Sequence, residues 1–250
     1  MAQLSAGVRR ARREAQRSVR IQGRASGLLG DCRRAFHAFG ELDELAENLR
    51  ILSLNAELAA GRAGEMGRAV RALTQYTREL VNRLAQIQGE MFGLRVKTYA
   101  LSSDVLRELL RLHLFERAAD LVAANSASSK SAGIVADRAF AQVMRRMVDT
   151  LDSLADSVEA VARRAQAIEE VVSQSDSIAT NIAIEASSAG VHEKEFRTVS
   201  DTMRRYVDDL RQMIDEASDA VRRALEKGDS LRRIGLENLH ELQAKRILGE

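Results

Sequence analysis

Apolar residues recur along this chain of 250 residues at intervals of three and four positions, and polar residues fill the intervals. The pattern runs through residues 28–56, 70–94, 134–178 and 196–225. Such intervals place the apolar side chains on one face of an α-helix, where they can pack against a neighbouring element. The pattern therefore predicts four helices of about 60 residues, each about 90 Å long at a rise of 1.5 Å per residue.

Three segments interrupt the apolar pattern. Two contain glycine, at residues 61–67 and at Gly190, and the third is the polar stretch 125–133, whose serines can cap the start of a new helix. Glycine adopts the positive φ angles that a tight reversal of direction requires. We therefore expect Gly64, Gly67 and Gly190 to form turns. Short turns between long helices predict an all-α fold, an antiparallel four-helix bundle built from two helical hairpins.

The composition supports a helical protein and narrows its class. The chain has no proline, the residue that most strongly breaks a helix, and only 4% aromatic residues. Apolar residues make up 45% of the chain, which argues against disorder, yet no run approaches a membrane span of about 18 apolar residues. The N-terminal arginines precede no apolar segment of a signal peptide. We therefore expect a soluble, cytoplasmic protein.

The charge is unevenly distributed near the N-terminus. Seven arginines lie between Arg9 and Arg24, and Glu14 is the only acid among them. Such a block can bind nucleic acid or anionic lipid, or it can be the solvated face of a packed helix. Apolar residues run through the block from Leu4 to Val19 at helical spacing, and neither interleaved aromatics nor a nucleic-acid module accompanies it, so the solvated face is favoured. We expect no nucleic-acid partner.

The two halves of the chain resemble each other. Shifted by 126 positions, residues 55–90 align without gaps on residues 181–216. Identical residues occupy Asn55/Asn181, Ala60/Ala186, Ala63/Ala189, Gly64/Gly190, Arg71/Arg197, Arg78/Arg204, Val81/Val207, Leu84/Leu210, Gln86/Gln212 and Glu90/Glu216. This repeat predicts two hairpins, residues 1–126 and 127–250, that together form one bundle.

The two glycine segments carry a more specific signal. Residues 49–80 read LRILSLNAELAAGRAGEMGRAVRALTQYTREL, and residues 171–205 read VVSQSDSIATNIAIEASSAGVHEKEFRTVSDTMRR. The first segment, and more loosely the second, resembles the hairpin tip of the cytoplasmic signalling domain of bacterial chemoreceptors, the methyl-accepting chemotaxis proteins. The string from Arg62 to Arg68, R-A-G-E-M-G-R, is the most specific part of this resemblance.

The resemblance implies a function. Chemoreceptors pair two identical hairpins in a four-helix bundle, so two tandem hairpins could form the same bundle within one monomeric chain. The implied role is that of a chemoreceptor-like signalling or scaffold protein that contacts a chemotaxis histidine kinase, its coupling adaptor, and chemoreceptors in their arrays. The implied contact residues at the tips are Asn55, Leu58, Arg62, Glu65, Val70, Asn181, Glu185 and Phe196. The alternative is a structural or adaptor bundle of receptor descent that has no kinase contact and uses its basic N-terminal helix on another partner.

Each tip departs from the family pattern at a charged position. The first keeps Arg62 but has Ala59 where the family has glutamate, and the second keeps Glu185 but has Ser188 where the family has arginine. The family pattern also has glycine at the position of Glu195. Two alternatives follow: the first tip alone contacts the partner, or Arg62 and Glu185 face each other across joined tips.

Enzyme and metal chemistry find little support in the sequence. A di-iron bundle requires two Glu-x-x-His motifs, and only Glu237–His240 has that spacing. Cys32 is the single cysteine, and no glycine loop follows the phosphate-binding pattern. We therefore expect neither an enzyme, nor a cofactor, nor a bound metal.

Overall fold

The computed structural model describes the chain at residues 21, 23–125 and 130–248, and this part consists of helices joined by short turns, without a strand. Residues 23–38 form a first helix. The elements that follow are α2 (Leu42–Arg62), the 3₁₀ turn η1 (Gly64–Gly67), α3 (Arg68–Asn125), α4 (Lys130–Ser188), the 3₁₀ turn η2 (Gly190–His192) and α5 (Glu193–Leu248). Helices α3, α4 and α5 have 58, 59 and 56 residues, so the prediction of an all-α bundle of long helices is confirmed.

The prediction of one continuous first helix is wrong, because a turn at residues 39–41 divides this segment into two helices. The Gly40 amide donates to the His37 carbonyl oxygen at 2.9 Å, and a methyl group on Gly40 would lie 3.0 Å from that oxygen. Phe39 and Leu42 are buried on either side of the turn. The apolar spacing therefore continues through the break, which is why the pattern alone does not reveal it.

The other predicted breaks are confirmed. Helix α2 ends at Arg62, α4 ends at Ser188, and α3 ends at Asn125 before α4 begins at Lys130. Of the serines in the predicted capping stretch, Ser126, Ser128 and Ser129 lie outside the described residues, and Ser131 lies inside α4. Gly133, expected in the break, lies inside α4.

The chain divides into two compact units. One, here called the turn unit, contains Arg34–Arg95 and Ala160–Ala220; the other, the terminal unit, contains Met1–Arg33, Val96–Glu159 and Val221–Glu250. Each unit takes segments from both halves of the predicted repeat, and the assignment of 1–126 and 127–250 to two hairpins stays a prediction.

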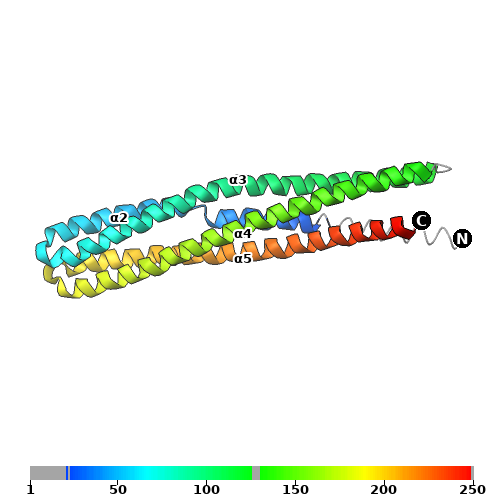
Figure 1. The fold of residues 1–250 in the computed structure, drawn as a ribbon. Helices are drawn as coiled ribbons and strands as arrows, with labels where there is room; N and C mark the ends of the chain where they lie inside the picture. The colour runs from blue at the N-terminus through cyan, green and yellow to red at the C-terminus, as the bar shows by residue number, and fades with distance from the viewer. Residues whose placement is uncertain (1–20, 22, 126–129, 249–250) are drawn as a thin grey trace. The chain divides into compact units, whose positions relative to one another are not determined.

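The turn unit is a four-helix bundle with a core of large aliphatic side chains. Leu49, Leu84, Ile168 and Leu210 come from four different segments and are almost completely buried. Ion pairs link neighbouring helices at the surface, and Glu57 of α2 pairs with Arg78 of α3. Figure 1 shows α2 joined to α3 and α4 joined to α5 by the two turns at one end of this unit.

The terminal unit contains a buried charge. Asp31 is inaccessible to solvent and accepts hydrogen bonds from Arg223 Nε at 3.2 Å and from Lys227 Nζ. Its neighbour Cys32 forms a hydrogen bond with Ser102 of α3, and burial raises the pKa of the Cys32 thiol to about 11. These contacts hold residues 23–33 between α5 and α3.

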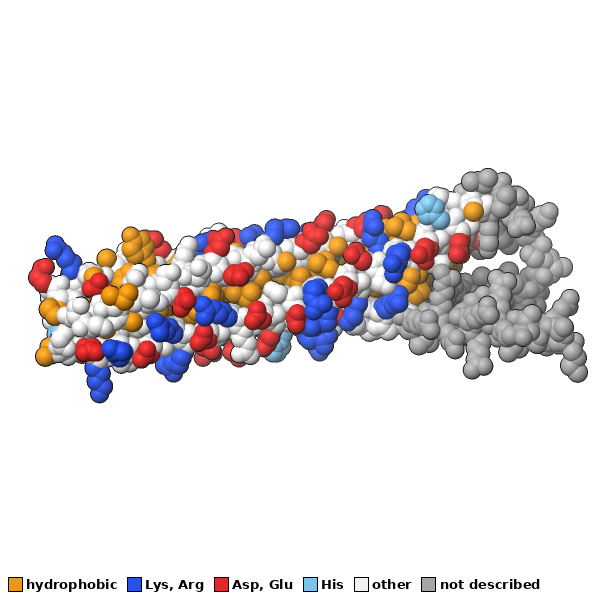
Figure 2. All heavy atoms as spheres, turned by 90° about the horizontal axis from the view of Figure 1, so that it is seen from below, with side chains coloured by type: hydrophobic (Ala, Val, Ile, Leu, Met, Phe, Trp, Pro, Cys, Tyr) orange, Lys and Arg blue, Asp and Glu red, His pale blue; other side chains and the backbone are white. Residues whose placement is uncertain are grey.

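The surface is mixed in charge. Figure 2 shows acidic and basic side chains interspersed over the face in view, with apolar side chains between them. No helix in the described part of the chain is long and apolar enough to cross a membrane.

Candidate interaction surface at the turns

Each of the two turns in the turn unit contains one glycine with a left-handed backbone conformation. Gly64 has φ of 60° and Gly190 has φ of 54°, and no other residue in the described ranges has a positive φ. A side chain in this conformation is strained, because its Cβ approaches its own carbonyl oxygen. The two glycines occupy the same position in the two repeats.

The two turns differ at the third residue after these glycines, which is Gly67 in the first turn and Glu193 in the second. A Cβ on Gly67 would collide with the Ala60 carbonyl oxygen, so α2 and α3 can approach closely only with glycine at this position. The matching residue of the second repeat is Glu193, and there α5 has already begun. The second turn is consequently shorter, with three residues in η2 against four in η1.

An ion pair connects the two turns. Arg62 Nη2 at the end of α2 lies 3.5 Å from Glu195 Oε1 at the start of α5, and His192 Nδ1 lies 3.6 Å from the second Glu195 oxygen. A methyl group on Gly190 would lie 3.9 Å from Met66 Cε, so the turns also approach each other through apolar atoms. Arg62 therefore has a partner from the second hairpin, but the partner is Glu195 rather than Glu185.

The structure separates the predicted contact residues into two groups. Asn55, Leu58, Arg62, Glu65 and Asn181 are exposed, and Glu185 is half-buried. Val70 and Phe196 are completely buried. They occupy matching positions in the first turn of α3 and α5, where the side chain points into the core. The expectation that these two contact a partner is corrected: they hold the turns onto the bundle.

Several exposed apolar side chains near the turns are not among the contact residues that the sequence predicts. Leu58 is 64% exposed and its counterpart Ile184 is 61% exposed, as expected for tip residues, but Ile51, Leu54, Met66 and Tyr76 are exposed as well, and Val191 is 93% exposed. The helical period could have found Ile51 and Leu54, because they lie beside the buried positions of α2 and not among them.

One hydrogen bond recurs in both hairpins. Ser53 Oγ donates to the Thr74 carbonyl oxygen at 3.0 Å, and Ser200 Oγ donates to the Ala179 carbonyl oxygen at 2.8 Å. Shifted by 126 positions, Ser53 matches Ala179 and Thr74 matches Ser200. The two hairpins thus join the same pair of positions by a hydrogen bond, with the donor on opposite helices.

Comparison with curated proteins finds the methyl-accepting chemotaxis protein McpN of Pseudomonas aeruginosa, which is 30% identical to this chain over 143 residues. The match covers 56% of the chain and 24% of McpN. No protein-family model and no solved structure matches the chain. The chain is chemoreceptor-like.

Across the described residues, no three His, Cys, Asp or Glu side chains come together as ligands. The two short turns expose polar and apolar side chains, and the ion pair between Arg62 and Glu195 connects them.

Proposed function

We propose that this chain is a signalling or scaffold protein whose turn surface contacts a chemotaxis histidine kinase and its coupling adaptor. The similarity to McpN supports a chemoreceptor-like role in general. The kinase and adaptor follow from the resemblance of the two turns to a receptor tip, and chemoreceptors are further candidates because they share those partners. The proposed location is the cytoplasm, where a kinase of this kind acts.

One observation carries the proposal. The first turn keeps Asn55, Arg62 and Glu65 of the family motif, and all three are exposed together with Leu58. Protein contacts depend on a few side chains of this kind, an apolar anchor surrounded by polar groups. The second turn has Val191 where the first has Glu65, and Ser188 where the motif has arginine. The first hairpin is therefore the proposed contact, with the second as its structural mate.

The proposal includes a monomer that mimics a receptor dimer. The repeat of 126 residues, the two left-handed glycines and the recurring hydrogen bond are what two copies of one ancestral hairpin would leave. The Arg62–Glu195 pair supports the same interpretation, since it ties the end of one hairpin's first helix to the start of the other's second.

A structural bundle without kinase contact is the second candidate. It is favoured by the same ion pair, because the Arg62 guanidinium already has a carboxylate partner within the chain. In this case the turn residues would stabilise the fold and contact no protein.

Purified kinase and adaptor separate the two candidates. The full chain carrying an affinity tag is incubated with the kinase, with the adaptor and with both, and retained protein is measured. Retention of the kinase or the adaptor supports the proposed function. Retention of neither, with the chain folded by circular dichroism, favours the structural bundle.

A further inference from the structure

Among the described residues, a single methionine lies at the surface. The sequence has seven methionines, and Met1 lies outside the described residues. Met66 in η1 is 50% exposed, whereas the other five described methionines are between 1% and 9% exposed: Met91, Met144, Met147, Met203 and Met213. Oxidation of a methionine sulfur requires that the oxidant reach it. The six side chains therefore differ in the first condition for that reaction.

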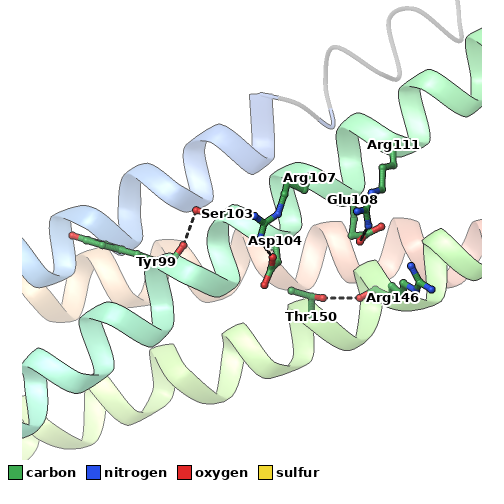
Figure 3. Close-up of polar contacts among 8 residues, drawn as sticks. All are labelled: Tyr99, Ser103, Asp104, Arg107, Glu108, Arg111, Arg146 and Thr150. Atoms are coloured by element: carbon green, nitrogen blue, oxygen red, sulfur yellow. Dashed lines mark hydrogen bonds and ion pairs between the residues drawn. The ribbon is translucent and has the colours of Figure 1, made fainter.

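The buried methionines are also enclosed by tight packing. In the terminal unit, a Cβ on Gly235 would lie 3.1 Å from Met147 Cε and 3.7 Å from Met144 Sδ. Figure 3 shows the same stretch of α4, where Arg146 is exposed and Thr150 Oγ donates to the Arg146 carbonyl oxygen at 2.7 Å. Met144 and Met147 lie on the opposite, buried side of this helix. An oxygen atom added to either sulfur would have to displace core side chains.

Met66 is part of the contact between the two turns. A methyl group on Gly190 would lie 3.9 Å from Met66 Cε, so the Met66 side chain ends against the second turn. At the matching position the second repeat has His192, whose Nδ1 lies 3.6 Å from Glu195 Oε2. The first turn therefore contributes an apolar group where the second contributes a polar one. Met66, Gly190 and the Arg62–Glu195 pair are here called the turn junction.

We propose that Met66 is a reversible oxidation site and that its oxidation loosens the turn junction. A hydroperoxide transfers one oxygen atom to Met66 Sδ: the O–O bond breaks, an S–O bond forms, and the sulfur loses two electrons. The hydroperoxide is reduced to water or an alcohol and keeps its own proton. The product, methionine sulfoxide, is polar, and methionine sulfoxide reductases return it to the thioether. This site does not depend on the proposed kinase contact.

Oxidation weakens the turn junction because it replaces an apolar group by a polar one. The sulfoxide oxygen requires hydrogen-bond donors, and those of the junction are in use. The His192 amide donates to the Ala189 carbonyl oxygen at 3.1 Å. The Arg62 guanidinium pairs with Glu195. Water supplies donors instead, so the sulfoxide turns toward solvent and its contact with the second turn is lost.

Peptide mass spectrometry of the full chain after brief treatment with hydrogen peroxide tests the site. Met66 should gain one oxygen atom before any of the five buried methionines, which serve as controls within the same sample. A mixture of reductases for the two sulfoxide epimers should remove that oxygen from the folded chain. Oxidation of the buried methionines as fast as Met66 would overturn the proposal, and so would a Met66 sulfoxide that the reductases leave unchanged.

Hydrogen exchange tests the effect on the turn junction. The oxidised chain should exchange the His192 amide about fourfold faster than the reduced chain, as expected from losing one buried methyl group. Met66→Leu is the matched control, because leucine keeps the apolar volume and has no sulfur. After the same peroxide treatment, this variant should show unchanged exchange. Unchanged exchange in the oxidised wild type would overturn the proposal, as would equal acceleration in Met66→Leu.

Discussion

The Arg62 guanidinium lies 3.5 Å from the Glu195 carboxylate, and this ion pair joins the two turns through residues that are 133 positions apart in the chain. Glu195 stands where the chemoreceptor pattern has glycine, so a departure from that pattern supplies the partner. Both side chains are about half exposed or more. The pair is therefore suited to fixing the relative position of the turns and contributes little to global stability.

Charge reversal tests this relationship. Arg62→Glu and Glu195→Arg should each lower the free energy of unfolding by under about 1 kcal/mol, and the double variant should recover most of the loss. Urea unfolding of all four proteins gives the coupling energy. The pair Glu65–Arg68, which lies within one turn, is a suitable control for a charge pair that joins no second hairpin. A loss of several kcal/mol in Arg62→Glu would mean that the arginine is required for folding.

The core of the terminal unit should be far more sensitive. Leu154 is 1% exposed, and Leu154→Ala should lower the free energy of unfolding by about 2–5 kcal/mol because it leaves a cavity. Phe140 follows the same apolar pattern but is only half-buried, so Phe140→Ala should cost less. Ile184→Ala, at an exposed site, should change stability by under about 0.5 kcal/mol. Equal losses in Leu154→Ala and Ile184→Ala would contradict the burial described.

The buried carboxylate should matter through its partners. Asp31→Asn leaves Arg223 and Lys227 without their shared acid, and we expect the free energy of unfolding to fall by about 3 kcal/mol. Asp152 pairs with Arg232 at the surface of the same unit, so Asp152→Asn is the matched control and should cost under about 1 kcal/mol. Urea unfolding measures both variants. If the two losses were the same, Asp31 would not be acting as a buried ion.

Cys32 should make stability depend on alkaline pH. Its thiol has a pKa of about 11 in the folded chain against an ordinary value of 9.0, so the folded state keeps the proton that the unfolded state loses. The stability contributed is complete below pH 9 and falls as the pH rises from about 9 to about 11, by about 2–3 kcal/mol. Comparison with Cys32→Ala isolates this effect from lysines and tyrosines. Rapid labelling of native Cys32 by a thiol reagent at neutral pH would contradict the burial of the thiol.

The sequence predicts the long helices well because a buried helix face requires apolar residues at a fixed period. It does not predict the turn at Gly40, since Phe39 and Leu42 keep that period across the break. The family resemblance places Val70 and Phe196 at the contact surface, whereas the apolar pattern predicts that both are buried. The structure shows both buried, as the apolar pattern predicts. The sequence does not predict Glu195 as the partner of Arg62, because the two residues are far apart in the chain and helical spacing predicts only contacts within one helix.

The most direct test of the proposed contact compares two matched residues. Leu58 and Ile184 occupy the same position in the two repeats and are 64% and 61% exposed, so serine at either site should leave the fold intact. Binding of the kinase and the adaptor is titrated against the wild type, Leu58→Ser and Ile184→Ser. One-sided recognition through the first hairpin predicts that Leu58→Ser weakens binding at least tenfold, the usual size of an interface anchor, and that Ile184→Ser leaves it unchanged. Equal weakening by both would mean that the turns bind as a pair, and unchanged binding in both would contradict a kinase or adaptor contact at the turns.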